Sequence, residues 1–231
     1  MATIDSHGHS PQPTDPNAPA WARYHAAHHF KDREHEFDSV KMGVWLFLGT
    51  EILLFSGMFC AYFIFRLLHP EAFIAGSGLL DWRIGLLNTV VLLVSSYTVA
   101  AGVRAAQVGD QVWLKRNIII TFVCGTAFLL IKLIFEYWPK YLQGKLPGKF
   151  FSYPGAVSPY EPMWWGVYWG ATGIHASHVI VGMGLFIWLL IRANRKEFGP
   201  THYNAVEGVG LYWHIVDIVW IFLFPMLYLI H

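Results

Sequence analysis

Five long apolar segments dominate this 231-residue chain and restrict what it can fold into. About 20 apolar residues in an α-helix, each rising about 1.5 Å, cross the roughly 30 Å of hydrocarbon in a bilayer. Lipid offers no hydrogen-bond partner to a free backbone amide, so helices are the expected form of each crossing segment. The expected spans are residues 42–68, 84–106, 118–137, 163–191 and 206–230.

The composition supports a membrane location. Charged residues make up 13% of the chain and hydrophobic residues 55%, whereas soluble domains carry about 25% charged residues. A soluble helical protein would need polar faces on most of the five segments, and these faces are missing. The net charge of +1 argues against nucleic acid as a partner. The sequence therefore predicts an all-α integral membrane protein, with five transmembrane helices within residues 41–231.

The distribution of basic residues predicts the orientation of the helices. With the N-terminus inside, ten Lys and Arg residues fall on the inner side and five on the outer side. Inner loops are usually the more basic ones, so the N-terminus is expected inside and the C-terminus outside. Residues 1–40 lack the basic-then-apolar pattern of a signal peptide and are expected to form a flexible cytoplasmic tail. A helix beginning at Trp21 is one option for its second half. The tail histidines are expected to be solvated rather than metal-bound: His7, His9, His25, His28, His29 and His35.

Few ionisable or amide side chains lie within the spans. Such groups are costly in lipid and usually face the protein interior. Counted from the inner end, Glu51 and His178 are expected roughly 15 and 20 Å deep, and His214 and Asp217 roughly 12 and 17 Å deep. Four polar groups from three spans are thus expected near one level. The candidate site residues are Glu51, Asn88, His175, His178, Glu207, His214 and Asp217, with Lys132 and Glu136 as a separate pair.

Helical spacing predicts how these side chains face. His175 and His178 are three residues apart and are expected to share a face lined by small residues. Glu207, His214 and Asp217 fall on one face of the last span, so that His214 and Asp217 can meet each other or bond to a neighbour. Mutual satisfaction of polar groups that hold helices together is the preferred interpretation, ahead of direct catalysis.

Two further possibilities concern charge and metal. Lys132 and Glu136 are four residues apart, which favours an ion pair or a lysine that extends towards the interface. A bis-histidine haem needs histidines on facing helices, whereas His175 and His178 lie on one helix. Together with His214 and either Glu51 or Asp217, the two histidines could make a histidine-rich metal site, but no spacing fixes that geometry. No catalytic, metal or cofactor site is therefore expected in this chain.

Four stretches resemble subunit III of the haem–copper terminal oxidases: TEILLFSGMFCAYF, LLNTVVLLVSS, TGIHASHVIVGMG and EGVGLYWHIVDIVWIFLF. They occur in the family's order from about residue 44 to the end, and the five spans correspond to the last five of the family's seven helices. The resemblance implies a non-catalytic subunit of a proton-pumping oxygen reductase. It also implies that haem and copper belong to partner subunits I and II.

The resemblance implies roles for individual residues. The family's buried glutamate, which reacts with hydrophobic carbodiimides, corresponds to Glu51. We expect Glu51 to be protonated or strongly hydrogen-bonded at pH 7, because an isolated carboxylate in hydrocarbon is unstable. Structural phospholipid is expected in an exposed groove near Asn88 and Glu51. The family's histidine and last-span motifs correspond to His175, His178, Glu207, Trp213, His214 and Asp217.

The expected function is that of subunit III of a cytochrome c oxidase in the aerobic respiratory chain of a bacterial plasma membrane. It would pack on subunit I, stabilise it and support proton uptake, with its histidine-rich tail buffering protons. The alternatives are subunit III of a quinol oxidase and an accessory protein of nitric oxide reductase. A stand-alone proton channel or transporter is a third class, in which the buried acids and histidines would form a relay. The stretch LYWHIVDIVWIFLF favours cytochrome c as the electron donor, and a respiratory supercomplex is a further possible assembly.

Overall fold

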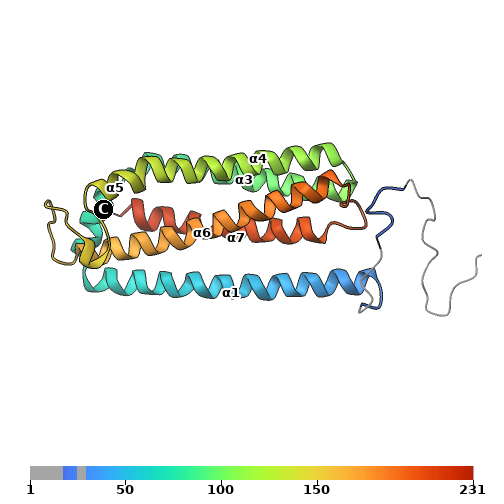
Figure 1. Cartoon of the computed structure of the whole chain (residues 1–231). Helices are drawn as coiled ribbons and strands as arrows, with labels where there is room; N and C mark the ends of the chain where they lie inside the picture. The colour runs from blue at the N-terminus through green and yellow to red at the C-terminus, as the bar shows by residue number, and fades with distance from the viewer. Residues whose placement is uncertain (1–17, 25–29, 231) are drawn as a thin grey trace, which may run out of the picture.

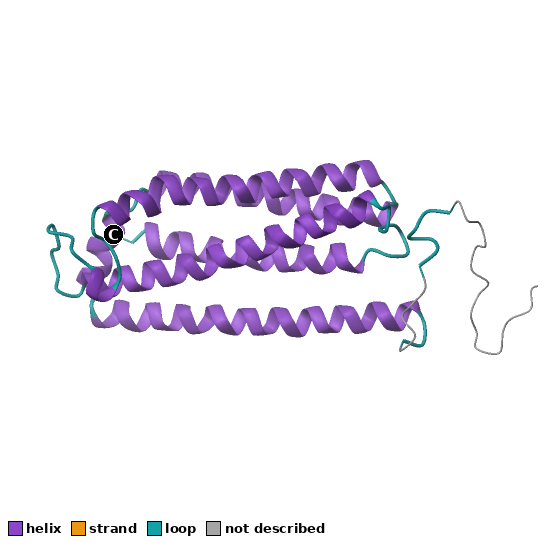
Figure 2. Ribbon diagram, viewed as in Figure 1, coloured by secondary structure: helices purple, strands orange, loops and turns teal. Residues whose placement is uncertain are grey.

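The computed structural model describes residues 18–24 and 30–230. Five of its helices are long and apolar enough to cross a membrane, and the described residues contain no β-strand (Figure 2). The prediction of an all-α bundle with five membrane-spanning helices is therefore confirmed. The spanning helices are α1 (Arg33–Leu68), α3 (Trp82–Val108), α4 (Gln111–Ile131) continued by η1 (Lys132–Tyr137) and α5 (Trp138–Leu142), α6 (Glu161–Asn194) and α7 (Asn204–Tyr228).

Most helices extend beyond their apolar segments. The helix α1 begins at Arg33 rather than at residue 42, because the Asp32 side chain accepts a hydrogen bond from the His35 amide at 2.7 Å. Residues 33–40, assigned to the tail from the sequence, are thus helical. A helix beginning at Trp21 is not found, since residues 20–23 form a turn. Residues 1–17 and 25–29, with five of the six tail histidines, lie outside the described residues.

Four helices form a closed ring, and the fifth lies beside it. In Figure 1, α3, α4, α6 and α7 pack around one another in the order α3–α4–α6–α7, and neighbours in the ring run antiparallel. The helix α1 packs on α7 and α6, and the short helix α2 (Pro70–Gly78) packs between the end of α1 and α6. The buried residues of α1 are Leu48, Phe55 and Tyr62, a single stripe with a spacing of seven. Tyr62 also donates to the carbonyl of Met226 in α7.

The N-terminal segment, residues 18–24, packs on the turn between α6 and α7. The Trp21 amide donates to the Lys196 carbonyl at 3.3 Å. The Trp21 ring covers Gly199 so closely that a Cβ added there would lie 2.5 Å from it. The Tyr24 ring stacks on His202 with 3.9 Å between ring centroids. The segment is therefore attached to the same end of the bundle as the start of α1.

Acidification is expected to loosen the N-terminal segment. Burial lowers the pKa of His202 from its ordinary value, so protonation of His202 opposes the Tyr24 stack. Because folding lowers the pKa of His202, the packed segment has its full stability above about pH 6.5, where the imidazole is neutral. It loses stability as the pH falls below that value. The charged groups that face His202 are Arg192 and Arg33, which lower its pKa further, and Glu36 and Glu197, which raise it.

Hydrogen exchange of residues 18–24 should therefore speed up between about pH 7.5 and pH 5, after correction for the intrinsic pH dependence of exchange. His202→Phe keeps an aromatic ring against Tyr24 and removes the titration, so exchange in this variant should depend far less on pH. Equal pH dependence in both proteins would contradict the assignment to His202.

Candidate functional site

Glu51 and His178 form a polar pair between α1 and α6 near the middle of the bundle. His178 Nε2 lies 2.7 Å from Glu51 Oε2, and the two side chains are only 16% and 14% exposed. The Phe55 ring lies 5.0 Å from the imidazole, and the Tyr212 hydroxyl donates to the His178 carbonyl at 2.9 Å. The carboxylate that stands alone in the apolar part of α1 thus has a partner, and the pair attaches α1 to the ring of helices.

The second nitrogen of His178 restricts where the proton of this pair can be. His178 Nδ1 lies 2.8 Å from the Ile174 carbonyl, which can only accept, so Nδ1 carries a hydrogen. In the neutral imidazole Nε2 then has no hydrogen. The bond to Glu51 therefore contains one proton, held either by the carboxylic acid or by an imidazolium. We expect the proton to be held by Glu51, because two separated charges would both have to be desolvated.

Infrared difference spectroscopy can identify the form that is present. We expect one protonated carboxylic acid carbonyl band that disappears in Glu51→Gln at pH 7. The exposed acid Glu71 provides the control, since Glu71→Gln should leave the band unchanged. A spectrum with only a carboxylate signal for Glu51 would contradict the neutral pair and indicate an imidazolium at His178.

The expectation that His175 and His178 share one face is wrong. His175 points into the ring of helices, where its imidazole lies 5.5 Å from the Phe128 ring and 5.2 Å from the Trp220 ring. It is 1% exposed, and neither ring nitrogen has a hydrogen-bond partner among the described residues. Positions three apart on a helix differ in direction by about 60°. That difference is enough for His178 to face α1 while His175 faces α4 and α7.

Side-chain hydrogen bonds join α3 to α7 at three levels. His214 Nδ1 lies 2.7 Å from Ser96 Oγ. The Trp213 indole donates to Ser95 Oγ, and the Trp220 indole donates to Thr89 Oγ1, each at 3.0 Å. His214 thus bonds to a neighbouring helix rather than to Asp217. The sequence motifs indicate His214 and Trp213, but they do not indicate the hydroxyl groups on α3 that bond to these side chains.

The other predicted residues are placed as follows. Glu207 reaches α1, where its carboxylate lies 3.4 Å from Lys41 Nζ. Asn88 and Asp217 are 0% and 2% exposed, and their polar side-chain atoms have no hydrogen-bond partner in the described part of the chain. The predicted site residues therefore occupy several separate contacts and do not form one cluster.

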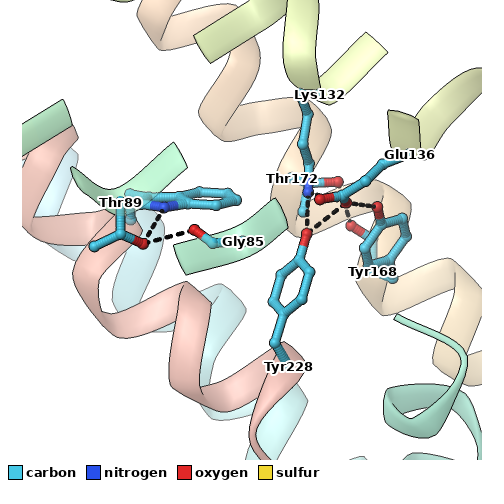
Figure 3. Close-up of polar contacts among 8 residues, drawn as sticks. Gly85, Thr89, Lys132, Glu136, Tyr168, Thr172 and Tyr228 are labelled. Carbon is cyan, nitrogen blue, oxygen red and sulfur yellow. Dashed lines mark hydrogen bonds and ion pairs between the residues drawn. The ribbon is translucent and has the colours of Figure 1, made fainter. Parts of the chain in front are cut away.

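A buried four-residue cluster joins α4, α6 and α7 (Figure 3). Lys132 Nζ lies 2.5 Å from Glu136 Oε2, and the Tyr168 hydroxyl donates to the same oxygen at 2.6 Å. The Tyr228 hydroxyl also donates to Glu136 Oε2 and accepts from Lys132 Nζ. All four side chains are at most 2% exposed. The cluster thus joins three helices through one carboxylate oxygen.

Aromatic rings surround the Lys132 ammonium group. Its nitrogen lies 4.9 Å from the Trp220 ring, 5.1 Å from Tyr228, 5.2 Å from Tyr168 and 5.8 Å from Tyr137. Cation–π attraction to these faces partly replaces the lost hydration. Lys132 therefore does not extend to the interface, which was the alternative considered from the sequence.

The helix around the ion pair is widened. Residues 132–137 form the π-helix η1, in which the amide of Trp138 bonds to the carbonyl of Leu133. Pro139 follows directly, and its ring would clash with the carbonyl of Phe135 in a regular α-helix. A π-helical turn accommodates one additional residue and relieves this clash. The widened turn begins at Lys132 and contains Glu136, so it sets the direction of both charged side chains.

Metal-ligating side chains are not grouped in the described ranges. Within residues 18–24 and 30–230, no three His, Cys, Asp or Glu side chains lie close enough to hold one metal ion. Cys60 and Cys124 are free thiols. Several polar side chains of the bundle instead bond to one another between helices.

These features define a multi-pass helical membrane protein whose interior charges and hydroxyls join neighbouring helices. A family model described as "Cytochrome c oxidase subunit III" matches residues 21–231. The chain belongs to this family and is a subunit of an oxidase complex. The resemblance of the four sequence stretches is thereby confirmed.

Individual relatives cover most of the chain. It is 35% identical over 191 residues to the "Probable cytochrome c oxidase subunit 3" of Mycobacterium tuberculosis, covering 83% of this chain and 88% of the relative. It is 31% identical over 193 residues to the cytochrome c oxidase subunit 3 of Corynebacterium diphtheriae, with the same shares covered. For the subunit of Papio hamadryas the identity is 28% over 198 residues, covering 82% of this chain and 69% of the relative.

Proposed function

We propose that the chain is subunit III of a proton-pumping cytochrome c oxidase in the aerobic respiratory chain of a bacterial plasma membrane. The observation that carries this proposal is the family match across residues 21–231. The names of the bacterial relatives, which include cytochrome c oxidase, support cytochrome c as the electron donor. In this proposal the N-terminus lies inside, haem and copper reside in subunits I and II, and this chain carries no catalytic centre.

The proposed role in the complex is structural support of subunit I and of proton uptake. Exposed small residues support close packing with a partner helix. On α1, Gly43 and Gly57 would each accept a Cβ without contact to any atom within 4 Å, so this side of the helix is smooth and open. The Glu51–His178 pair fixes α1 to the bundle, and α1 in turn carries the N-terminal end that would face the inner surface.

We also propose that a phospholipid chain occupies the groove between α1 and α6. This groove has a volume of about 430 Å³ and is lined by Met58 and Phe65 from α1 and by residues 162–174 of α6. Twelve helical residues span about 18 Å, close to one leaflet of hydrocarbon. Ile174 at the inner end of the groove also accepts the hydrogen bond from His178. The groove therefore leads to the Glu51–His178 pair.

Co-purification tests the proposal. A tag on this chain should recover from native membranes a complex with haem and copper absorbance that oxidises reduced cytochrome c. Removal of the chain from that complex should slow proton uptake and shorten the lifetime of activity, while the haem and copper remain bound. Recovery without haem or copper would overturn the proposal.

Two alternatives in the same family are decided by the same purification. Oxidation of quinol but not of cytochrome c would indicate a quinol oxidase, and nitric oxide reduction would indicate the accessory protein of that enzyme. The geometry does not favour a stand-alone channel. A relay would need bonds that run on from one buried group to the next. The Glu51–His178 pair instead ends at the Ile174 carbonyl, His214 bonds to Ser96 on α3, and His175 lies among aromatic rings.

A further inference from the structure

A second groove lies at the other end of the membrane, between α3 and α4 where the turn at residues 109–110 joins them. It has a volume of about 300 Å³. Ala101 and Ala105 form part of its wall, and Arg104, Asp110, Trp113 and Asn117 line the rest. The small apolar side chains of the lining come from α3, while the charged and aromatic side chains come from both helices and their turn.

Two guanidinium groups flank this groove without acidic partners. Arg104 lines it directly, and the Arg116 guanidinium lies 5.0 Å from the centroid of the ring of Trp113, which is another lining residue. Neither arginine forms an ion pair within the described chain. At the same end of the bundle, by contrast, Lys41 pairs with Glu207 at 3.4 Å and Arg192 with Glu197 at 2.6 Å.

The one acidic residue that lines the groove, Asp110, is hydrogen-bonded to the first turn of α4. Asp110 Oδ1 accepts hydrogen bonds from the amides of Val112 and Trp113, each at 3.0 Å. Its carboxylate thus caps α4 and does not neutralise either arginine. Two positive charges and one capped negative charge leave the groove with a positive balance that suits an anion.

The surroundings fit the boundary between hydrocarbon and headgroups. Val108, Val112 and Trp113 are 58%, 76% and 53% exposed and lie beside the arginines. Further along the same helices, Tyr97 is 74% exposed and Ile119 48% exposed. Aromatic and basic residues above an apolar surface are typical of the membrane interface. Basic pockets between transmembrane helices bind anionic lipid headgroups.

We propose that this groove binds an anionic phospholipid, with the phosphate between Arg104 and Arg116 and the glycerol and upper acyl chain on Ala101 and Ala105. A guanidinium can donate two parallel hydrogen bonds to a phosphate, which a zwitterionic headgroup with its own cation satisfies less well. The site lies at the opposite end of the membrane from the α1–α6 groove and does not depend on the electron donor of the oxidase.

Thermal unfolding of the purified complex in detergent tests this site. Dioctanoyl phosphatidylglycerol should raise the Tm progressively as its concentration is increased, because a ligand that binds only the folded state stabilises it. Dioctanoyl phosphatidylcholine and inorganic phosphate should not. The double variant Arg104→Gln/Arg116→Gln should lose the shift. Arg83→Gln is the matched control, since Arg83 also stacks on a neighbouring ring, that of Trp82, but at the other end of α3.

A second measurement keeps the proposal testable if the double variant is less stable. After loosely bound lipid has been washed away with detergent, mass spectrometry should count the anionic phospholipids that each complex retains. The double variant should retain about one fewer than the wild type and Arg83→Gln. Equal anionic lipid and equal Tm shifts in all three proteins would overturn the proposal. So would a shift caused by inorganic phosphate alone, or a photo-crosslinker at Ala101 that captures another subunit instead of lipid.

Discussion

Lys132→Met is expected to destabilise the folded chain by about 3–5 kcal/mol, because it leaves the Glu136 carboxylate buried without its counter-ion. Glu136 is 1% exposed, and only the Tyr168 and Tyr228 hydroxyls would remain as donors to it. The methionine keeps the volume and flexibility of the lysine stem, so packing against the surrounding rings changes little. The free energy of unfolding can be measured on the purified chain in mixed micelles by titration with SDS.

The double variant Lys132→Met/Glu136→Gln separates the charge effect from packing. A glutamine oxygen can still accept from both tyrosines, while neither member of the ion pair keeps a charge, so this variant should lose less stability than Lys132→Met alone. Lys149→Met is the matched control, because Lys149 is exposed in the segment between α5 and α6 and should change stability by less than about 0.5 kcal/mol. A loss below about 1 kcal/mol in Lys132→Met would place this pair with surface ion pairs and contradict the prediction.

Contacts within one helix could be predicted from the sequence, whereas contacts between helices could not. Lys132 and Glu136 are four residues apart, a spacing that indicates a neighbour on any helix. The tyrosines that complete their site are 32 and 92 residues away from Glu136, and Glu51 and His178 are 127 residues apart. Apolar patterning does not encode which helices touch or how each helix is rotated. The number of spans is therefore predictable, while the partners of most buried polar groups are not.

Two local features of the fold, the π-helix η1 and the short helix α2, are indicated by prolines in the sequence. Pro139 indicates a disturbance of the preceding helical turn, and the structure has a π-helix there. Pro70 occupies the first turn of α2, where proline is favoured, and this nine-residue helix is too short to stand out as a span. The sequence alone does not predict which helices His175 and His178 face. The two side chains point about 60° apart around α6, and in a tight bundle this angle is enough to give them different neighbouring helices.

Gly182→Val is expected to separate α6 from α7. A Cβ added at Gly182 would lie 2.7 Å from the Trp213 ring and 3.3 Å from Tyr212. Trp213 is 0% exposed, packs edge-on against Phe186 at 5.0 Å and donates to Ser95 at 3.0 Å. The ring cannot withdraw without losing that hydrogen bond and opening the α3–α7 contact. Overpacking of this kind costs about 1–3 kcal/mol or more, and the same SDS titration measures the loss.

Gly184→Val is the matched control, because it introduces the same β-branched side chain two residues further along the same helix. A Cβ at Gly184 meets no atom within 4 Å, so the isolated chain should keep nearly its full stability. Similar losses in both variants would show that helix propensity, rather than contact with Trp213, decides the outcome. Assembly provides a second distinction. If Gly184→Val folds normally but no longer joins the oxidase complex, this open side of α6 faces a partner subunit, whereas normal assembly would indicate that it faces lipid.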